Sequence, residues 1–458
     1  MENTQMDNGI QITAKQVVNG EVTEEVILVN HSVTKVTSID QLGFTHLEQI
    51  ELLRNCQESL LKAQSHSLQS EQSVCPKCDT RLKFAGSVLS EFHSVFTDHK
   101  VSVRRKKCCN KACGWTSVPS ISSLFNTNVH PDLAKLQTEM ACNHTYRESE
   151  KIMTAMSGHL RKVNNHKHIH RTVELVGNYI SEHLINDTSE SVATASTLIC
   201  QVDGGHLKSK DPSSRSFEVL TSAIYNPEHV KYPAKKETQI LEKDDLPRGQ
   251  ILSKHCAASA LDDDAVSIKQ QTLWAARKEG MTVETHLIAL CDGARNCWHV
   301  IESLEDQCGQ VTKILDWFHI AKRFTHIVLP KYLTKKLDKL KWCIWHGKVE
   351  EGLSRFESII EKTRAQKIKV RLMALQTYLQ NNKDYLVNYS KRHQAGDVIS
   401  SSFAESTVES LINKRCKGKQ HMMWTREGAH PLLQVRACAA SNDWAYQAEN
   451  YVLKAITQ

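Results

Sequence analysis

The sequence predicts a multidomain α/β protein with a small cysteine-bearing module, a helical module, and a sheet core interrupted by an all-helical insertion. Three observations lead to this expectation. Two groups of closely spaced cysteines lie within residues 75–113, helical periodicity runs through residues 128–187, and later apolar runs end in acids at Asp203 and Asp292. Short strands that alternate with helices are typical of an α/β core.

Length and composition are those of a globular protein with several compact units. The chain has 458 residues, of which 40% are hydrophobic and 24% are charged, which excludes a fibrous or wholly disordered class. The net charge of +7 permits a polyanionic partner without requiring one. No apolar run approaches the roughly eighteen residues of a membrane span, so we expect none. Fifteen cysteines and no signal-peptide pattern in residues 1–30 predict an intracellular location.

Residues 1–70 are interpreted as a poorly specified polar arm followed by a helix. The first 45 or so residues show little periodicity, whereas later apolar residues recur at helical spacing, namely Leu47, Ile50, Leu53, Leu60 and Leu61. The helix is expected to lead into the cysteine-bearing module.

Residues 71–125 carry two cysteine knuckles separated by about thirty residues with strand-like alternation. The first is Cys75-Pro-Lys-Cys78, and the second contains Cys108, Cys109 and Cys113. Thiolates are preferred ligands of Zn²⁺, and a CxxC turn places two sulfurs on one side of the ion. The pattern predicts a zinc-ribbon-like module whose structural zinc is bound by Cys75, Cys78, Cys109 and Cys113. Cys108 replaces Cys109 if the turn is wound differently, and cysteines without a metal are the alternative.

Residues 126–190 show short helical segments joined by tight turns, over roughly 133–140, 146–156 and 161–184. The last segment is rich in basic and hydrogen-bonding residues. This pattern is typical of a helix-turn-helix DNA-binding domain whose final helix enters a major groove. The predicted DNA-binding residues are Arg161, Lys162, Lys167 and Arg171, together with Lys414 and Arg415 of a later basic cluster. A solvated surface is the alternative for each cluster, and irregular spacing argues against metal binding by the histidines.

A Ser-, Thr- and Ala-rich linker over 187–196 precedes the third region. Within residues 196–328, apolar runs predict strands over 197–203, 217–225, 255–261, 286–292 and 311–316, with helices over 265–278 and near 298–307. Three strands, a helix, then strand, helix and strand is the order of an RNase H-like core. Residues 329–398 have only helical periodicity and are interpreted as an all-helical insertion. Residues 399–458 are expected to complete the core.

Three acids in this core are predicted to be catalytic. Phosphodiester cleavage and strand transfer need an activated oxygen nucleophile and a stabilised leaving oxygen, which two divalent cations supply. Mg²⁺ takes oxygen ligands, so several carboxylates must converge. Asp203 in the first strand, Asp292 after the fourth strand and Glu409 on a later helix are expected to be both the catalytic residues and the Mg²⁺ ligands. Glu405 lies one helical turn before Glu409 and is the alternative to it.

Four further residues have two open interpretations each. Asp316 and His319 follow the last strand and either form a helix N-cap and a core pair or position the substrate, with metal ligation less favoured. Trp424 and Arg426 either stack on and clamp DNA or pack against the core. The run Asp262, Asp263 and Asp264 precedes a helix and is interpreted as capping.

Together these motifs resemble bacterial insertion-sequence transposases of the DDE class, on the Mutator-related side. The resemblance covers roughly residues 75–440 and rests on Val202-Asp203-Gly204, the run from Cys291 to Arg295, the run from Ile314 to His319, the run from Thr407 to Ser410, the run from Asn413 to Arg415 and the run from Met423 to Ala429. It implies an RNase H-like catalytic domain that uses Mg²⁺ or Mn²⁺. The implied substrate is double-stranded DNA with terminal inverted repeats, which the enzyme cleaves and joins. By analogy, the protein is a homo-oligomer of the bacterial cytoplasm and nucleoid.

Two other classes of function remain open. A transposase-derived regulator would bind specific DNA sequences without cutting them, and a resolvase or RNase H-type nuclease would share the metal chemistry. The acid triad favours an enzyme, because convergent carboxylates repel one another and need a cation. Two DNA-binding modules ahead of the core favour a transposase over a nuclease.

Overall fold

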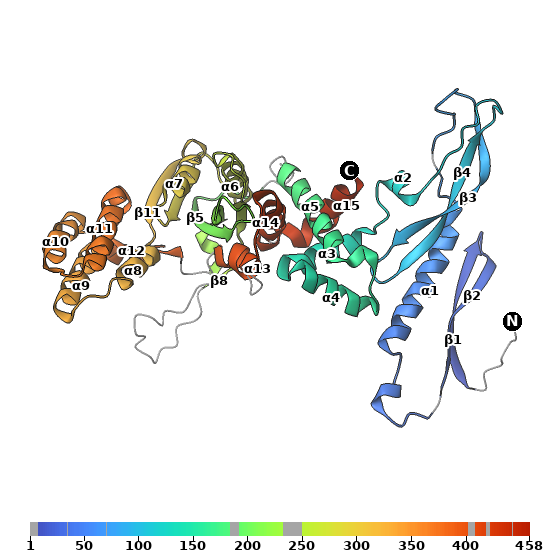
Figure 1. The fold of residues 1–458 in the computed structure, drawn as a ribbon, viewed down its shortest axis with the longest axis horizontal. Coiled ribbons are helices and arrows are strands. Elements are labelled where there is room, and N and C mark those ends of the chain that lie inside the picture. The colour runs from blue at the N-terminus through green and yellow to red at the C-terminus, as the bar shows by residue number, and fades with distance from the viewer. Residues whose placement is uncertain are drawn as a thin grey trace. The chain divides into compact units, whose positions relative to one another are not determined.

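The computed structural model describes residues 8–33, 35–69, 71–183, 192–231, 250–401, 408–417, 422–441 and 443–458. The chain is mixed α/β, as predicted (Figure 1). It divides into two compact units, one formed by Met1–Val176 with Ala448–Gln458 and the other by Gly177–Gln447. None of the helices in the described ranges combines the length and apolar character that crossing a bilayer requires.

The first unit begins with an antiparallel hairpin of β1 (Gly9–Val18) and β2 (Glu21–Ser32). Its turn residues Asn19 and Gly20 have φ angles of 52° and 86°, the left-handed conformation that Asn-Gly adopts in two-residue hairpin turns. The expected polar arm therefore contains a hairpin, and this dipeptide is the sequence signal for it. A 3-10 turn at Ile39–Gln41 follows. The predicted helix is α1 (His46–Ser65), which begins at a capping box of Thr45 and Glu48.

A second antiparallel hairpin consists of β3 (Leu82–His93) and β4 (Asp98–Cys108). The predicted alternation is confirmed at Val101 and Val103, which are buried against Ile121 of the short helix α2 (Ile121–Phe125). Leu61 of α1 packs against the same cluster. One face of the hairpin is therefore covered by helices, while its far end carries the cysteines.

Three helices follow in the helical module: α3 (Pro131–Asn143), α4 (Tyr146–Ser157) and α5 (His166–His183). The last helix begins at residue 166 rather than 161. Asn165 determines this start, because its side-chain oxygen accepts the main-chain N–H groups of Lys167 and His168 at 3.0 Å each. The preceding Lys162–Asn164 forms a 3-10 turn. The chain ends in α15 (Asp443–Thr457).

The second unit is built on a five-stranded mixed sheet of order β11-β10-β5-β6-β9. The strands are β5 (Thr197–Lys208), β6 (Ser216–Tyr225), β9 (His255–Ser259), β10 (His286–Cys291) and β11 (Gln310–Leu315). β10 is parallel to both β5 and β11, whereas β6 is antiparallel to β5 and β9. All five predicted strands are confirmed. A small ribbon of β7 (Val230–Lys231) and β8 (Gln250–Ile251) lies outside this sheet.

Helices pack on the sheet of the second unit. α6 (Val266–Lys278) contacts β6 and β9, with a hydrogen bond of 2.8 Å between the hydroxyls of Ser222 and Thr272. The N-cap residue of this helix is Ala265, and the carboxylate of Asp263 accepts the N–H of Ser267 in the first turn. The other elements are α7 (Arg295–Glu302), a 3-10 turn at Pro227–His229, another at Glu305–Gln307, the π-helical turn Glu409–Asn413, α13 (Lys414–Cys416) and α14 (Arg426–Ala440).

Helices form over most of residues 329–398, the segment predicted to be an all-helical insertion. After α8 (Trp317–Thr325), the chain forms α9 (Lys331–Trp345), α10 (Val349–Lys362), α11 (Gln366–Asn381), a 3-10 turn at Lys383–Tyr385 and α12 (Tyr389–Ala395). These helices lie together next to β11 (Figure 1). Apolar residues at helical spacing form their core, including Leu337, Leu340, Ile344, Phe356, Leu372 and Leu379.

Candidate functional site

Four cysteines are spaced as the ligands of one metal ion. The Sγ atoms of Cys75, Cys78, Cys108 and Cys113 all lie within 4.8 Å of one another. The Cys75–Cys113 and Cys78–Cys108 sulfur distances are 3.7 and 3.5 Å. Tetrahedral Zn²⁺ with bonds of about 2.3 Å places its sulfurs about 3.8 Å apart, whereas a disulfide joins them at about 2.05 Å. The donor set therefore fits a structural zinc ion, and none of the fifteen cysteines, all of which are described, is in a disulfide.

The two cysteine turns share one local design. Cys75 Sγ accepts the main-chain N–H of Lys77 at 3.4 Å, and Cys108 Sγ accepts that of Asn110 at 3.3 Å. Hydrogen bonds to sulfur favour the thiolate form, which is the form that binds a metal. Hydrogen bonding with Thr80 lowers the pKa of Cys78 to about 6, while burial raises the pKa of Cys108 to about 12. Metal binding at neutral pH would therefore release protons from the cluster.

The fourth ligand position is held by Cys108, which corrects the prediction of Cys109. Cys108 ends β4 opposite Leu82, and its side chain is buried with Cys75, Cys113 and Trp115. Cys109 is exposed, and its main-chain N–H donates to the carbonyl of Arg81. Successive side chains of an extended segment point to opposite sides, so only one residue of the doubled cysteine can face the cluster.

In the second unit, three acids lie at one level of adjacent parallel strands, Asp203 within β5 and Asp292 and Asp316 directly after β10 and β11. Val202 of β5 is in register with Cys291 of β10, which is in register with Leu315 of β11. Asp203, Asp292 and Asp316 each follow one of these residues. Residues at one level of adjacent strands point to the same face of a sheet. The three carboxylates therefore lie on one face, and Asp203, Asp292 and Asp316 are together called the acidic edge.

The environment of Asp203 shows that charged groups gather at this edge. Burial raises the pKa of Asp203 to about 6, His319 opposes this effect, and the negative charges of Asp292 and Asp316 reinforce it. Asp292 is held by the N–H of Ala294, which donates to its Oδ1 at 2.9 Å. A proton or a divalent cation would relieve the repulsion between these carboxylates.

Asp316 acts as a helix N-cap, which was one of its two predicted roles. Its Oδ1 accepts the N–H of Phe318 at 2.8 Å at the start of α8. Its Oδ2 accepts the N–H of Ser401 at 3.1 Å and the hydroxyl of the same serine. His319 Nε2 lies 3.9 Å from this oxygen. Both oxygens of this buried carboxylate are therefore engaged by the protein, which argues against metal ligation by Asp316.

Glu409 lies on a helical turn that packs against β5. A Cβ atom at Gly205 would lie 2.8 Å from Ile412 Cδ1 and 3.1 Å from Val408 Cγ1, so the small residue permits this close approach. Asp203 and Gly205 are two residues apart on β5, so they face the same side of the sheet. Glu409 itself is exposed, and its carboxylate accepts from the Asn413 side chain at 2.7 Å. The alternative residue, Glu405, lies outside the described residues.

The three predicted catalytic carboxylates are not gathered into one tight group. Within the described ranges, the cysteine cluster is the only set of three or more His, Cys, Asp or Glu side chains whose ligand atoms all lie within 4.8 Å of one another. Asp203 and Asp292 share the sheet edge, whereas Glu409 is on the adjoining turn. A cation shared by all three requires these side chains to come closer together.

Two tyrosines of the helical insertion support the acidic edge, and sequence reasoning missed both. Tyr378 of α11 donates to the main-chain oxygen of Asp292 at 2.8 Å, and Tyr389 of α12 donates to that of Leu315 at 2.6 Å. A Cβ atom at Gly293, where φ is +89°, would lie 3.0 Å from the side chain of Asn382, whose Oδ1 accepts from Trp298 Nε1 at 3.1 Å. A tyrosine at an apolar helix position carries no sequence signal for such a contact.

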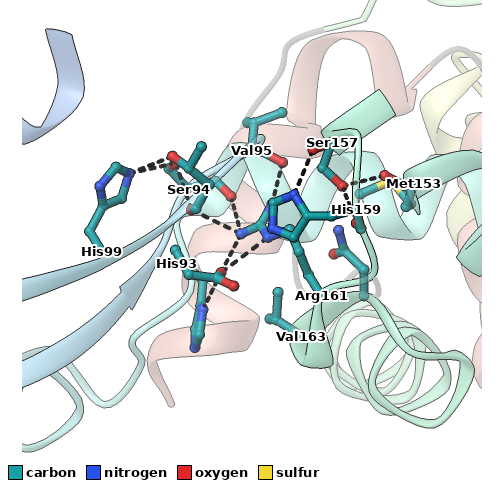
Figure 2. A network of polar contacts seen from close by, with 12 residues as sticks. His93, Ser94, Val95, His99, Met153, Ser157, His159, Arg161 and Val163 are labelled. Atoms are coloured by element: carbon teal, nitrogen blue, oxygen red, sulfur yellow. Dashed lines mark hydrogen bonds and ion pairs between the residues drawn. The ribbon is translucent and has the colours of Figure 1, made fainter. Parts of the chain in front are cut away.

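Arg161 is a structural residue, which corrects its predicted DNA-binding role. Its side chain is fully buried, and the guanidinium donates to the carbonyls of Ser94, Val95 and Thr97 at 2.7–2.9 Å (Figure 2). It also pairs with Asp98 at 2.6 Å. Burial opposes ionisation of Asp98, but hydrogen bonds from His93 and Arg161 hold its pKa well below the usual range. No phosphate can reach a guanidinium that is enclosed in this way.

We expect Arg161→Met to destabilise the first unit by about 3 kcal/mol, because it leaves three carbonyls and a carboxylate without their donor. Hydrogen exchange measured by mass spectrometry should show faster exchange in the loop 94–98. The neighbouring Lys162 is exposed, so Lys162→Met is the matched control and should exchange as the wild type does. Equal protection in both variants would contradict the structural role of Arg161.

The other predicted DNA-contacting residues divide into exposed and buried groups. Lys162, Lys167, Arg171 and Lys414 are exposed. Arg415 is only 3% exposed, and its guanidinium lies 5.6 Å from the centre of the Trp424 ring. Its predicted contact with DNA is therefore wrong for this structure, because a buried side chain cannot reach a phosphate.

Trp424 and Arg426 pack against the core, the second of their two predicted roles. Trp424 is buried, its Nε1 donates to the Cys416 carbonyl at 3.2 Å, and its main chain pairs with Lys208. Arg426 donates to the carbonyl of Ala260 at 2.9 Å. The two residues therefore fix the start of α14 and the segment before it against the core.

Comparison of the chain with protein-family models and with curated proteins found no match in either.

Proposed function

We propose that this protein is a DDE-type DNA transposase that cleaves and joins DNA at the ends of an insertion sequence with Mg²⁺ or Mn²⁺. The observation that carries the proposal is the acidic edge, where Asp203 within β5 and Asp292 directly after the parallel strand β10 lie at the same level of the sheet. The sheet supports it too, since β6 and β9 lie on one side of β5 and β10 and β11 on the other. This arrangement agrees with an RNase H-like core.

Asp203, Asp292 and Glu409 are the proposed metal ligands and catalytic residues. A pair of divalent ions bound there would activate the attacking oxygen and stabilise the leaving oxygen. Asp203 and Asp292 supply carboxylate oxygens from the sheet, and Glu409 supplies one from the turn that packs on Gly205. Asp316 acts as a positioning residue, because it fixes α8 and Ser401 beside the edge.

The proposed substrate is double-stranded DNA with terminal inverted repeats. We assign its recognition to the zinc-ribbon-like module and to the helices α3–α5, taken as a helix-turn-helix. Lys162, Lys167 and Arg171 remain the proposed DNA-contacting residues, with Lys414 as a further phosphate contact. A homo-oligomer that pairs two DNA ends, in the bacterial cytoplasm, is part of the same proposal.

Replacing Lys162, Lys167 and Arg171 together by Ala is expected to weaken binding to the terminal repeats. Each lost phosphate contact should reduce the slope of log K against log salt by about 0.9. Binding isotherms at several salt concentrations measure this slope. An unchanged slope would move the DNA-binding face elsewhere, with the basic residues 104–107 of β4 as the next candidate.

A transposase-derived DNA-binding regulator is the second candidate. It is favoured by the exposure of Glu409 and because Asp203, Asp292 and Glu409 do not form one group of ligand atoms within 4.8 Å of one another. The deciding experiment incubates the full chain with Mg²⁺ and a plasmid that carries the repeats flanking its own coding sequence. Nicked, linear or joined products support the transposase. Specific binding of the repeats without any cleavage supports the regulator.

A further inference from the structure

An open recess of about 670 Å³ lies on the helical insertion, between α9 and α10. Its lining is cationic and aromatic, and no acid is among the residues that form it: Lys339, Trp342, Cys343, His346, Lys348 and Arg355. Arg355 is held in place by Glu351, whose carboxylate accepts from it at 2.6 Å. The recess is separate from the acidic edge of the sheet and from the cysteine cluster, and neither site explains it.

The two helices that form the recess are held close together by glycines. Gly347 turns the chain between them with φ of +73°. A Cβ atom at Gly352 of α10 would lie 2.7 Å from Ile344 Cδ1 of α9. Side chains from α9 and from α10 therefore both line the recess.

An aromatic cluster fixes the position of Trp342. Trp342 packs edge to face against Trp345 at 5.9 Å between ring centres, and Trp345 stacks with Tyr389 at 6.2 Å. Trp342 still has 37% of its surface exposed. An exposed indole on a rigid support is suited to stacking a planar ligand, because little side-chain freedom is lost on binding.

Positive charge is concentrated around the recess. α9 contains five lysines and a single acid, Asp338. Lys362 at the end of α10 lies close enough to Lys336 to lower the pKa of that lysine. Acids on α10 partly offset this charge, but of these only Glu351 is paired with a residue of the recess. Like charges kept this close are stabilised by a polyanion.

We propose that this recess binds single-stranded DNA, with one base stacked on Trp342 and adjacent phosphates bound by Lys339, Lys348 and Arg355. A paired base exposes only its edges in the grooves, so a stacking indole selects unpaired strands. The role of this binding site rests on the proposed function, because a DNA-cutting enzyme frees a single strand beside the cut. The same insertion contacts the acidic edge through Tyr378 and Tyr389, so the strand would be held next to the reacting ends.

The test uses the full chain carrying Asp203→Asn, with Lys162, Lys167 and Arg171 also replaced by Ala to weaken the duplex site. Fluorescence anisotropy follows a labelled thymidine oligonucleotide of about ten nucleotides. In this background, Trp342→Ala should weaken binding about tenfold, as expected for the loss of one stacked base, and Trp342→Phe should retain most of the affinity. Tyr332→Ala is the matched control, because Tyr332 is an exposed aromatic of α9 outside the recess.

A second pair of variants tests the phosphate contacts. Lys339→Ala should reduce the salt slope by about 0.7, whereas Lys331→Ala at the exposed start of the same helix should not. Equal affinity for an abasic oligonucleotide or for duplex DNA, or unchanged binding by Trp342→Ala, would overturn the proposal. Because binding is measured without cleavage, an inactive wild-type enzyme would refute the proposed function and leave this inference standing.

Discussion

Asp203→Asn and Asp292→Asn are each expected to reduce DNA cleavage by several orders of magnitude while leaving repeat binding unchanged. Each change removes a negative charge from the acidic edge but keeps the shape of the side chain, so the proposed ions lose a ligand. Residues that act as one unit show such large single effects. The measurement is cleavage of a repeat-bearing plasmid in Mg²⁺, alongside binding of the same repeats without metal.

Three further variants make this prediction specific. Glu409→Gln should be inactive, whereas Glu405→Gln should retain cleavage if Glu409 is the third ligand. Asp316→Asn should mainly affect stability, because Asp316 is an N-cap whose oxygens are both engaged. Normal cleavage by Asp203→Asn and Asp292→Asn would refute the DDE assignment. An active Glu409→Gln beside an inactive Glu405→Gln would transfer the ligand role to Glu405.

Cys108→Ser is expected to release the zinc ion and unfold the cysteine end of the β3–β4 hairpin. The cluster there has a very small apolar core, with Leu82 and Trp115 as its neighbours, so a metal must supply much of its folding free energy. Metal analysis of the purified chain should find one zinc per molecule in the wild type and less in the variant. Hydrogen exchange over residues 75–115 should rise in parallel.

Cys109→Ser is the matched control, since it makes the same chemical change one residue away at an exposed site. It should keep its zinc and its protection from exchange. Loss of zinc in Cys109→Ser together with retention of zinc in Cys108→Ser would show that Cys109 is the ligand. A wild-type protein without zinc would refute a zinc site altogether.

The sheet could be predicted because its strands are apolar runs that end in turn residues and acids. Buried parallel strands such as β10 need apolar side chains on both faces, which makes their positions visible in the sequence. The cysteine knuckles were equally visible, since metal ligands must recur at fixed spacing. The strand periodicity that would distinguish Cys108 from Cys109 is interrupted before the second knuckle, because the hairpin register shifts between Phe84 and Ser87, opposite Lys106 and Arg104.

The roles of the basic side chains were harder to predict. A basic residue in a helical module suggests a DNA contact, but Arg161 and Arg415 satisfy acceptors and an aromatic ring inside the protein. Those acceptors are main-chain carbonyls, which every residue carries and no sequence pattern marks. The supporting tyrosines Tyr378 and Tyr389 were missed for the same reason.

The enclosed guanidinium of Arg161 also bears on how the chain can be divided. Residues 71–125 and 126–190 look like two modules, yet the loop between β3 and β4 depends on a side chain from the second of them. A fragment that stops near residue 125 would keep its cysteines but leave Ser94, Val95 and Thr97 without their donor. Shortened versions of this protein should therefore extend through α5 (His166–His183), so that the hairpin and its arginine are made on the same polypeptide.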